Sequence, residues 1–334
     1  MSAFVVSVTR RIPRIGVDLL REQPDIDLRV HDHDAPPTHE EWEALLDGAD
    51  GVLSLLSEHY TGDILDAHPS IRVLSNFGVG YDNIDVPAAT ERGVAVCNTP
   101  GVLTAATAEI AWALLMAAAR RVPEAIDFIK AGEWNSWGPT TMLGQPVVGA
   151  TIGIVGYGRI GQEVAKMARG FGMRVLAWDR SPHTKPADGV EFVEFADLLA
   201  NSDYVSIHVP LTPETHHLLD AAALAKMKPT AILINSARGP VVDQDALITA
   251  LQTGTIWAAG LDVTTPEPLA PDHPLVTMPN CVVLPHIGSA TITARDAMSS
   301  LAARNLIAVL RGETPPHIVN PSVLDHIRPQ EPPA

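Results

Sequence analysis

The sequence predicts an α/β protein with two domains, each built on a doubly wound parallel β-sheet. Its 334 residues exceed the usual size of a single hydrophobic core. Short apolar runs alternate with segments of helical periodicity, as in parallel strands joined by covering helices. A glycine-rich turn lies between one such run and one such helix near the middle of the chain. We therefore expect two hydrophobic cores and a cleft.

The first sheet is expected from apolar runs at residues 4–8, 28–30, 51–55, 71–74 and 94–96, separated by helical patterns such as residues 40–46. A long helix is expected from Thr104, whose hydroxyl can cap it, to about Arg121, before Pro123. This helix could bridge the two domains. Six further runs, enough for a complete second sheet, follow at residues 151–155, 174–178, 204–208, 231–235, 258–263 and 281–284. The last expected helix covers residues 290–311.

Composition argues against several classes of function. Hydrophobic residues make up 46% of the chain and charged residues 19%, which is typical of a globular protein. The net charge of −16 disfavours nucleic acid and anionic membranes, so small molecules are the expected partners. We expect neither a signal peptide nor a membrane span, because the start of the chain lacks signal features and the apolar stretch at residues 110–119 is short. Cys97 and Cys281 lie far apart without metal-ligand spacing, which predicts no disulfide, no metal site and a cytoplasmic location.

Residues 156–161 read Gly-Tyr-Gly-Arg-Ile-Gly, between an expected strand and a helix expected to begin near Arg159. In this setting Gly156 permits a tight turn and Gly158 lets a pyrophosphate approach the backbone. Gly161 allows the helix to pack closely on the strand. The helix N-terminus adds backbone amides and the positive end of a dipole. The pattern predicts a dinucleotide-binding Rossmann domain.

Asp179 ends the next expected strand, 18 residues after the last glycine, near the position where an acid binds the ribose hydroxyls of the cofactor. Its carboxylate would repel a 2′-phosphate and therefore favours NADH. The adjacent Arg180 could instead neutralise or stack on an adenosine phosphate. NADH is the expected cofactor, with NADPH or dual use left open.

Three side chains follow expected strands of the second sheet: Arg238, Glu267 and His286. Ligands bind at the carboxyl edge of such sheets, so the three should converge on one site. Reducing a 2-keto acid requires a cation for the carboxylate and carbonyl, a proton donor for the alkoxide and a hydride from a cofactor. Arg238 supplies the cation and His286 the proton, while Glu267 favours the imidazolium form and orients the ring. Taken singly, each residue could equally be an ion-pair or loop residue.

Four segments together resemble the D-2-hydroxyacid dehydrogenase family: the glycine-rich turn, residues 235–239, residues 260–268 and residues 284–291. The resemblance covers nearly the whole chain. Residues 53–56, 132–137 and 281–291 are most similar to glyoxylate/hydroxypyruvate reductases. The resemblance implies that Arg238 binds substrate and that Glu267 partners His286, the proton donor. It also implies a Rossmann dinucleotide domain, residues 102–288, inserted in a flavodoxin-like substrate domain made of residues 1–101 and 289–334.

The resemblance implies further site residues. The backbone amides of Val79 and Gly80 would bind the substrate carboxylate, and Leu55 and Trp137 would favour a compact substrate. Members of the family are usually homodimers, in which a tryptophan like Trp137 reaches the partner's site; core packing is its other interpretation. The cofactor residues implied by the turn and by the resemblance are Thr107, Gly156, Gly158, Arg159, Ile160, Gly161, Asp179, Arg180, Pro210, Thr215, Ser236, Asp262 and Gly288.

The expected activity is reduction of glyoxylate to glycolate or of hydroxypyruvate to D-glycerate. Two alternatives stay open. The three side chains contact only the part that all these substrates share, so the substrate could be phosphite, 2-ketogluconate or a bulkier 2-keto acid. A non-catalytic, NAD-sensing interaction protein could share the fold and the same three residues. Similar reductases often prefer NADPH and carry a small residue at the position of Asp179, which keeps dual cofactor use open.

Overall fold

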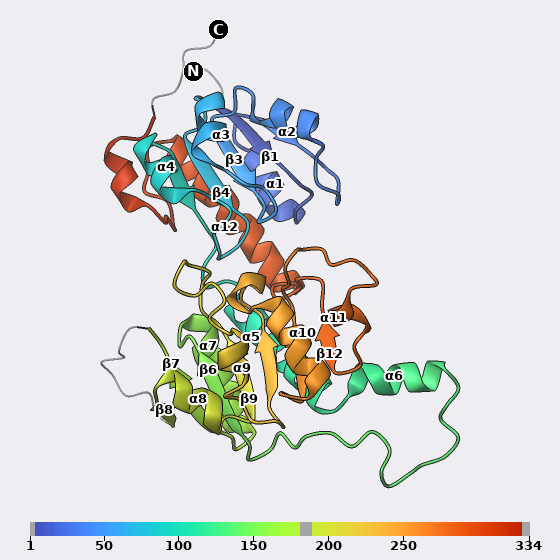
Figure 1. Cartoon of the computed structure of the whole chain (residues 1–334). Helices are drawn as coiled ribbons and strands as arrows, with labels where there is room; N and C mark the ends of the chain where they lie inside the picture. The colour runs from blue at the N-terminus through green and yellow to red at the C-terminus, as the bar shows by residue number, and fades with distance from the viewer. Residues whose placement is uncertain (1–3, 181–188, 329–334) are drawn as a thin grey trace. The chain divides into compact units, whose positions relative to one another are not determined.

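The computed structural model describes residues 4–180 and 189–328, and the chain divides into two compact units (Figure 1). Unit 1 consists of Met1–Leu103 and Ala290–Ala334, and unit 2 is the intervening Thr104–Ser289. Each unit has its own parallel sheet with helices packed against it. The predicted fold class, two parallel-sheet α/β domains, is confirmed.

Unit 1 has a five-stranded parallel sheet in the order β2-β1-β3-β4-β5. Its strands are β1 (Phe4–Val8), β2 (Ile26–Val30), β3 (Gly51–Ser54), β4 (Val73–Asn76) and β5 (Ala95–Cys97). Its helices are α1 (Arg14–Arg21), α2 (His39–Leu46), α3 (Gly62–Ala67), α4 (Val86–Glu91), α12 (Ile292–Leu310) and the short 3-10 helix η2 (Pro321–Asp325). The strand order reverses between β1 and β3. The carboxyl ends of the strands at such a point are where ligands of open α/β sheets bind.

The C-terminal helix α12 belongs to the N-terminal unit because it packs on α1, β3 and β4. Thr291 caps the helix by accepting the backbone N–H of Ala294. Gly16 in α1 lies so close to Ser299 that a Cβ atom there would be 2.3 Å from its hydroxyl oxygen. This close approach joins segments that are almost a whole chain length apart.

Unit 2 has a seven-stranded parallel sheet in the order β12-β11-β10-β9-β6-β7-β8. Its strands are β6 (Thr151–Val155), β7 (Arg174–Trp178), β8 (Val190–Phe192), β9 (Tyr204–Ile207), β10 (Ile232–Asn235), β11 (Ala258–Leu261) and β12 (Cys281–Val283). Its helices are α5 (Thr104–Ala119), α6 (Val122–Lys130), α7 (Arg159–Gly170), α8 (Phe195–Asn201), α9 (Ala221–Leu224), η1 (Gly239–Val241), α10 (Gln244–Thr253) and α11 (Pro274–Thr277). The reversal of strand order lies between β6 and β9.

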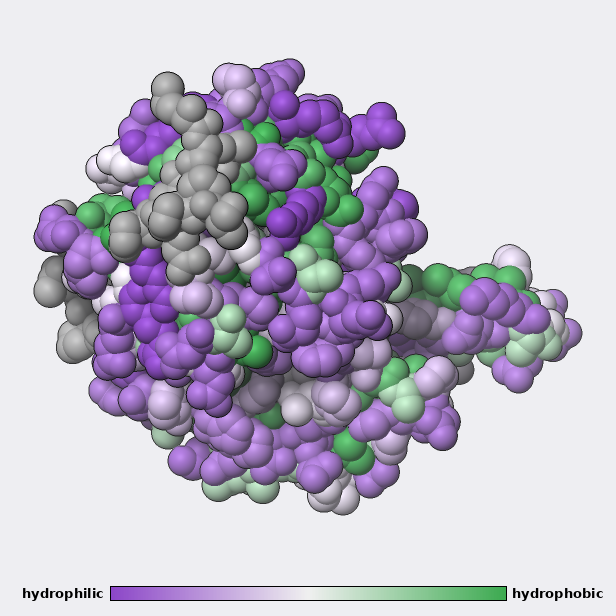
Figure 2. Space-filling model, turned by 90° about the horizontal axis from the view of Figure 1, so that it is seen from above, coloured by the Kyte–Doolittle hydropathy of each residue, from purple (hydrophilic) through white to green (hydrophobic). Residues whose placement is uncertain are grey.

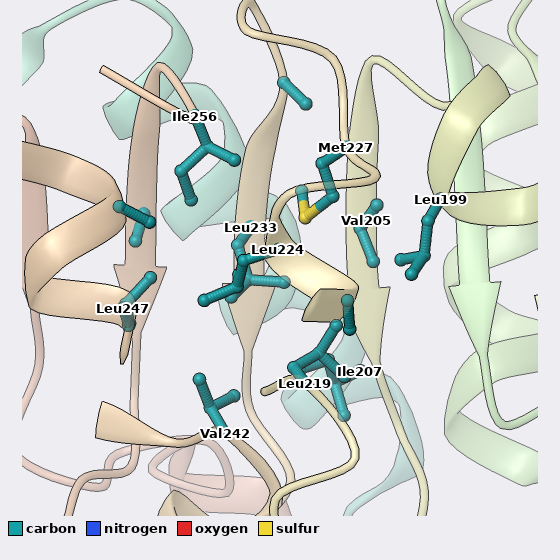
Figure 3. Close-up of a cluster of buried hydrophobic side chains, with 14 of the residues drawn as sticks. Leu199, Val205, Ile207, Leu219, Leu224, Met227, Leu233, Val242, Leu247 and Ile256 are labelled. Atoms are coloured by element: carbon teal, nitrogen blue, oxygen red, sulfur yellow. The ribbon is translucent and has the colours of Figure 1, made fainter. Parts of the chain in front are cut away.

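Two hydrophobic cores cover the two faces of this sheet, because successive strand residues point to opposite sides. Leu233 of β10 packs with side chains of α8, α9 and α10, among them Leu224 and Leu247 (Figure 3). Its neighbours Ile232 and Ile234 join the core formed with α5 and α7. These three residues of β10 are fully buried, and truncating such a side chain to Ala typically costs about 2–5 kcal/mol.

Three features differ from the expectation. The sheet of unit 2 has a seventh strand, β8, at its edge, where only three residues pair with β7. The helix expected to reach Arg121 ends at Ala119, because Arg121 adopts a left-handed conformation with φ of 52°. A separate helix, α6, then begins at Val122 and has no buried residue.

Both cysteines are buried and unpaired, and burial raises the pKa of each thiol to about 12. They therefore act as small apolar residues, as predicted. Within residues 4–180 and 189–328, no helix is long and apolar enough to cross a membrane.

Candidate active site

Glu267 and His286 meet at the carboxyl edge of the unit 2 sheet. Glu267 follows β11, and His286 follows the neighbouring strand β12. The Nδ1 atom of His286 lies 2.9 Å from Oε2 of Glu267. An ionised carboxylate can only accept, so Nδ1 carries the proton of this hydrogen bond. The other ring nitrogen, Nε2, is left for a ligand.

The Glu267 carboxylate is held by its own loop. Its Oε1 accepts the backbone N–H of Thr264 at 2.9 Å. Gln244, the first residue of α10, holds the backbone of Thr265 with two hydrogen bonds. Its Oε1 accepts the N–H of Thr265 at 3.0 Å, and its side-chain amide donates to the carbonyl of Thr265. Partial burial acts to raise the pKa of Glu267, but the hydrogen bond and charge of His286, with smaller contributions from Thr264 and Arg238, lower it below its ordinary value. Glu267 is therefore ionised at neutral pH.

Asp262, at the end of β11, fixes the loop that carries His286. Its carboxylate accepts the backbone N–H groups of Ile287 at 2.8 Å and Gly288 at 2.7 Å, and its carbonyl accepts that of His286 at 2.9 Å. The residue is 1% exposed. Burial raises the pKa of Asp262, although these hydrogen bonds and the charge of His286 oppose the shift. His286 itself has a left-handed backbone with φ of 53°, a conformation that this network enforces.

Arg238 follows β10, the next strand in the sheet. Asn235 is buried and shapes the turn: its Nδ2 donates to the carbonyl of Arg238 at 2.8 Å, and its Oδ1 accepts the N–H of Ala237 at 3.0 Å. The Nη1 atom of Arg238 donates to the carbonyl of Ala237 at 2.8 Å. The guanidinium charge contributes to the lowered pKa of Glu267. The carboxyl edge of the unit 2 sheet thus holds a cation, Arg238, beside the Glu267–His286 pair.

The glycine-rich turn fits a dinucleotide. Gly156 has φ of 97°, and a Cβ atom there would lie 2.7 Å from the backbone nitrogen of Val209. A Cβ on Gly161 would lie 2.2 Å from the carbonyl oxygen of Gly156, so only glycine allows α7 to pack this closely. Gly158 has open space around it and provides no side-chain cap, which leaves the first amides of α7, including those of Arg159 and Ile160, to an anionic ligand.

The adenosine end of the predicted site lies just after β7. Asp179 accepts the backbone N–H of Tyr157, in the glycine-rich turn, at 3.2 Å. The exposed Arg180 donates to Glu214 at 3.1 Å. The segment that follows Arg180, residues 181–188, lies outside the described part of the chain.

The remaining predicted cofactor residues line the same edge of unit 2. Thr107 lies beside Gly288, where a Cβ would be 3.5 Å from its methyl group. Thr215 is buried and its hydroxyl donates to the carbonyl of Pro210 at 2.7 Å, which shapes the loop after β9. The buried hydroxyl of Ser236 has no hydrogen-bond partner among the described residues. Such an orphaned group suits a polar ligand.

Four predicted substrate residues are not part of this cluster. Val79, Gly80 and Leu55 belong to unit 1, at the carboxyl ends of β4 and β3. Trp137 lies beyond α6 in unit 2 and is 82% exposed, so the structure of a single chain does not support core packing for this residue.

Sequence reasoning missed the residues that hold the site in place. Gln244 and Thr264 act on the Glu267 loop through backbone hydrogen bonds, which leave no mark in the pattern of side chains. The buried amides of Asn76 and Asn83 in unit 1 were also missed. The one available signal was the two asparagines within residues 76–83, shortly after an expected strand.

A parallel sheet with a glycine-rich dinucleotide turn and an adjacent acid–histidine pair defines a nicotinamide-dependent oxidoreductase. Comparison with known proteins gives the family. The family model for the NAD binding domain of D-isomer specific 2-hydroxyacid dehydrogenases matches residues 112–288.

Relatives that match over nearly their whole length support the same family. The chain is 48% identical to the glyoxylate reductase of Korarchaeum cryptofilum over 322 residues, 96% of each protein. It is also 48% identical to that of Thermococcus kodakarensis over 328 residues, covering 96% of this chain and 97% of the relative. The structure of an NADPH-dependent glyoxylate/hydroxypyruvate reductase from Sinorhizobium meliloti, in complex with NADP and malonate, covers 100% of both chains with a TM-score of 0.83 at 32% identity. The chain belongs to the D-2-hydroxyacid dehydrogenase family and is an NAD(P)-dependent oxidoreductase, as predicted.

Proposed function

We propose that this protein reduces glyoxylate to glycolate, and hydroxypyruvate to D-glycerate, at the site built around His286. The observation that carries the proposal is the 2.9 Å contact between His286 and Glu267, with the charge of Arg238 nearby. The names of full-length relatives at 45–48% identity, all glyoxylate reductases, support the choice of substrate.

In the proposed mechanism each of the three side chains has one task. A nicotinamide cofactor held at the glycine-rich turn would supply the hydride for the carbonyl carbon. Arg238 binds the carboxylate and polarises the carbonyl. His286 donates a proton from Nε2 to the carbonyl oxygen as the alkoxide develops, because Nδ1 is engaged by Glu267. Glu267 stabilises the imidazolium before the transfer, and the neutral ring is then reprotonated from water.

We assign dinucleotide binding to unit 2 and part of the substrate binding to unit 1. In unit 1, none of the described residues accepts a hydrogen bond from the backbone N–H of Val79 or Gly80. Two adjacent amides of this kind can bind a carboxylate. Leu55 would place an apolar side chain next to the C2 substituent, which favours a small substrate.

NADH is the proposed cofactor. The carboxylate of Asp179 would repel a 2′-phosphate, and Arg180, the nearest cation in sequence, already pairs with Glu214. Binding of NADH and NADPH, measured by fluorescence titration, tests this for the wild type and for Asp179→Ser. Wild-type protein should bind NADH more tightly, and the variant should lose that preference. A strong preference of the wild type for NADPH would rule the assignment out.

We also propose a homodimer formed through α6 and the segment that follows it. This part of unit 2 projects outward with apolar surface exposed (Figures 1 and 2). Its exposed large apolar side chains are Val122, Ile126, Ile129, Trp134, Trp137 and Leu143. Surfaces of this kind normally mark an interaction site. Light scattering after size exclusion should give twice the chain mass, and Ile129→Asp should shift the protein to monomer; a monomeric wild type would end the proposal.

Two buried, unpaired cysteines suit a reducing compartment, and we propose that the enzyme is located in the cytoplasm.

The activity is tested by following NAD(P)H absorbance with a panel of acids: glyoxylate, hydroxypyruvate, 2-ketogluconate and a branched 2-keto acid. Phosphite is tested in the opposite direction, with NAD(P)⁺. Glyoxylate should give the highest kcat/KM. A higher kcat/KM for another acid would show that this acid, and not glyoxylate, is the preferred substrate. No turnover with any of them, alongside normal NADH binding, would favour a non-catalytic NAD sensor.

A further inference from the structure

Two loops at the carboxyl edge of the unit 1 sheet are joined by a pair of buried amide side chains. Asn76 ends β4, and Asn83 lies seven residues further on, in the loop before α4. The Nδ2 atom of Asn76 donates to Oδ1 of Asn83 at 3.0 Å. Both side chains are almost completely buried. Buried amides are costly unless hydrogen-bonded, and both are hydrogen-bonded here.

Asn83 holds the loop after β3. Its Nδ2 donates to the carbonyl of Leu55 at 3.1 Å and to that of Glu58 at 2.8 Å. The N–H of Leu55 in turn donates to Oε2 of Glu58 at 3.1 Å. The backbone of Leu55 is therefore fixed at both its N–H and its carbonyl.

Asn76 holds the loop after β4. Its Nδ2 also donates to the carbonyl of Gly80, at 2.8 Å. The two preceding carbonyls are held as well: that of Gly78 accepts the N–H of Thr99 at 2.9 Å, and that of Val79 accepts Nδ2 of Asn98 at 2.8 Å.

These bonds determine where the amides of this loop point. In a planar trans peptide the carbonyl and the N–H point in opposite directions. The N–H of Val79 shares a peptide with the Gly78 carbonyl, and the N–H of Gly80 shares one with the Val79 carbonyl. Because both carbonyls are bonded within unit 1, both N–H groups point the opposite way, and neither has an acceptor among the described residues.

The two loops also touch directly. A Cβ atom on Gly78 would lie 2.9 Å from a methyl carbon of Leu56, so a side chain there would push the loops apart. One loop cannot shift without disturbing the other.

We propose that Asn76 and Asn83 are positioning residues that set the loop carrying the amides of Val79 and Gly80 in register with the loop carrying Leu55. Asn76 orients the groups that bind the carboxylate, and Asn83 sets the distance from the carboxylate to the apolar residue that limits the C2 substituent. The inference rests on the proposed function of these loops as the substrate-binding part of the enzyme.

The two residues predict different kinetic effects. Asn76→Asp keeps the oxygen that accepts the Ser54 hydroxyl but removes the donor to Gly80 and to Asn83. It should raise KM about tenfold for glyoxylate and hydroxypyruvate alike, since both share the carboxylate. Asn83→Asp keeps the acceptor for Asn76 but removes the donors to the Leu55 loop. It should change the ratio of kcat/KM between the two substrates by about fivefold or more.

Asn320 provides a matched control. It is a buried asparagine in the same unit whose Nδ2 donates to Thr90 and to the carbonyl of Val94, and whose Oδ1 accepts the N–H of Val96. Asn320→Asp should lower Tm by a similar amount and leave both KM values and the substrate ratio unchanged. The uncharged variants Asn76→Ala and Asn83→Ala make the same comparison if either Asp variant fails to fold.

The outcomes separate the two proposals. KM for NADH should stay unchanged in every variant. If the wild type reduces glyoxylate and the Asn76 and Asn83 variants differ from Asn320→Asp only in Tm, the positioning role is refuted and the proposed function stands. If the wild type reduces no 2-keto acid, the proposed function fails and the positioning role fails with it.

Discussion

Replacing Glu267 with Gln tests the acid–histidine pair without changing its shape. Oε1 of Glu267 accepts the N–H of Thr264, so an amide at this position must place its oxygen there and its NH₂ group toward His286. Nδ1 of His286 would then have to accept a hydrogen bond instead of donating one. The substitution therefore opposes the imidazolium form that the proposed proton transfer requires.

The expected size of the effect follows from the geometry. A hydrogen bond to a charged group contributes about 1.5–3 kcal/mol. The side chains of Glu267 and His286 are 37% and 33% exposed, and solvent screening reduces the value to about half. The resulting loss of about 0.8–1.5 kcal/mol corresponds to a fall in kcat/KM of about four- to twelvefold.

The assay is kcat/KM for glyoxylate as a function of pH. Glu267→Gln should lower the value about four- to twelvefold at neutral pH, with NADH affinity unchanged. Glu191→Gln is the control, because it removes a carboxylate from an ion pair with Arg174 on β7, away from the site. A pH profile for Glu267→Gln that coincides with that of the wild type would refute the reasoning.

Two further substitutions test other parts of the structure. Burial raises the pKa of the Glu58 carboxyl above its ordinary value of 4.5, so the folded state binds a proton at Glu58 more tightly than the unfolded state does. The free energy of unfolding therefore falls as the pH rises from the ordinary pKa to the raised pKa. Glu58→Gln should flatten this slope in urea denaturation at a series of pH values, and an unchanged slope would contradict the assignment. Gln244→Ala should loosen the Glu267 loop and lower kcat about threefold without changing KM for NADH. Gln252→Ala, on the same helix, should have no effect, and equal effects of the two would rule out a role for the hydrogen bonds of Gln244.

Most strands could be predicted because parallel strands are buried on both faces and read as apolar runs. β6 and β7 match the predicted residues 151–155 and 174–178. β8 was missed because it is a three-residue edge strand, half-buried at its ends, with exposed Glu191 at its centre. The end of α5 close to Arg121 was expected, but α6 was missed because it has no buried residue and so contributes to neither of the hydrophobic cores that the sequence pattern predicts.

The candidate catalytic residues could be predicted because each comes directly after a strand, and β11 and β12 are neighbours. The residues that position them could not. Thr264 acts through a backbone N–H, and Gln244 meets Thr265 only after the chain has passed through β11. Asn83 bonds to carbonyl groups, which every residue has, so no side-chain pattern reveals its partners.

The most direct test of the central claim is the turnover of His286→Ala with glyoxylate and NADH, measured together with NADH binding. The account predicts a loss of kcat of about a thousandfold, because the substitution removes the proposed proton donor, with NADH affinity close to that of the wild type. Turnover near the wild-type rate would show that His286 is not the proton donor.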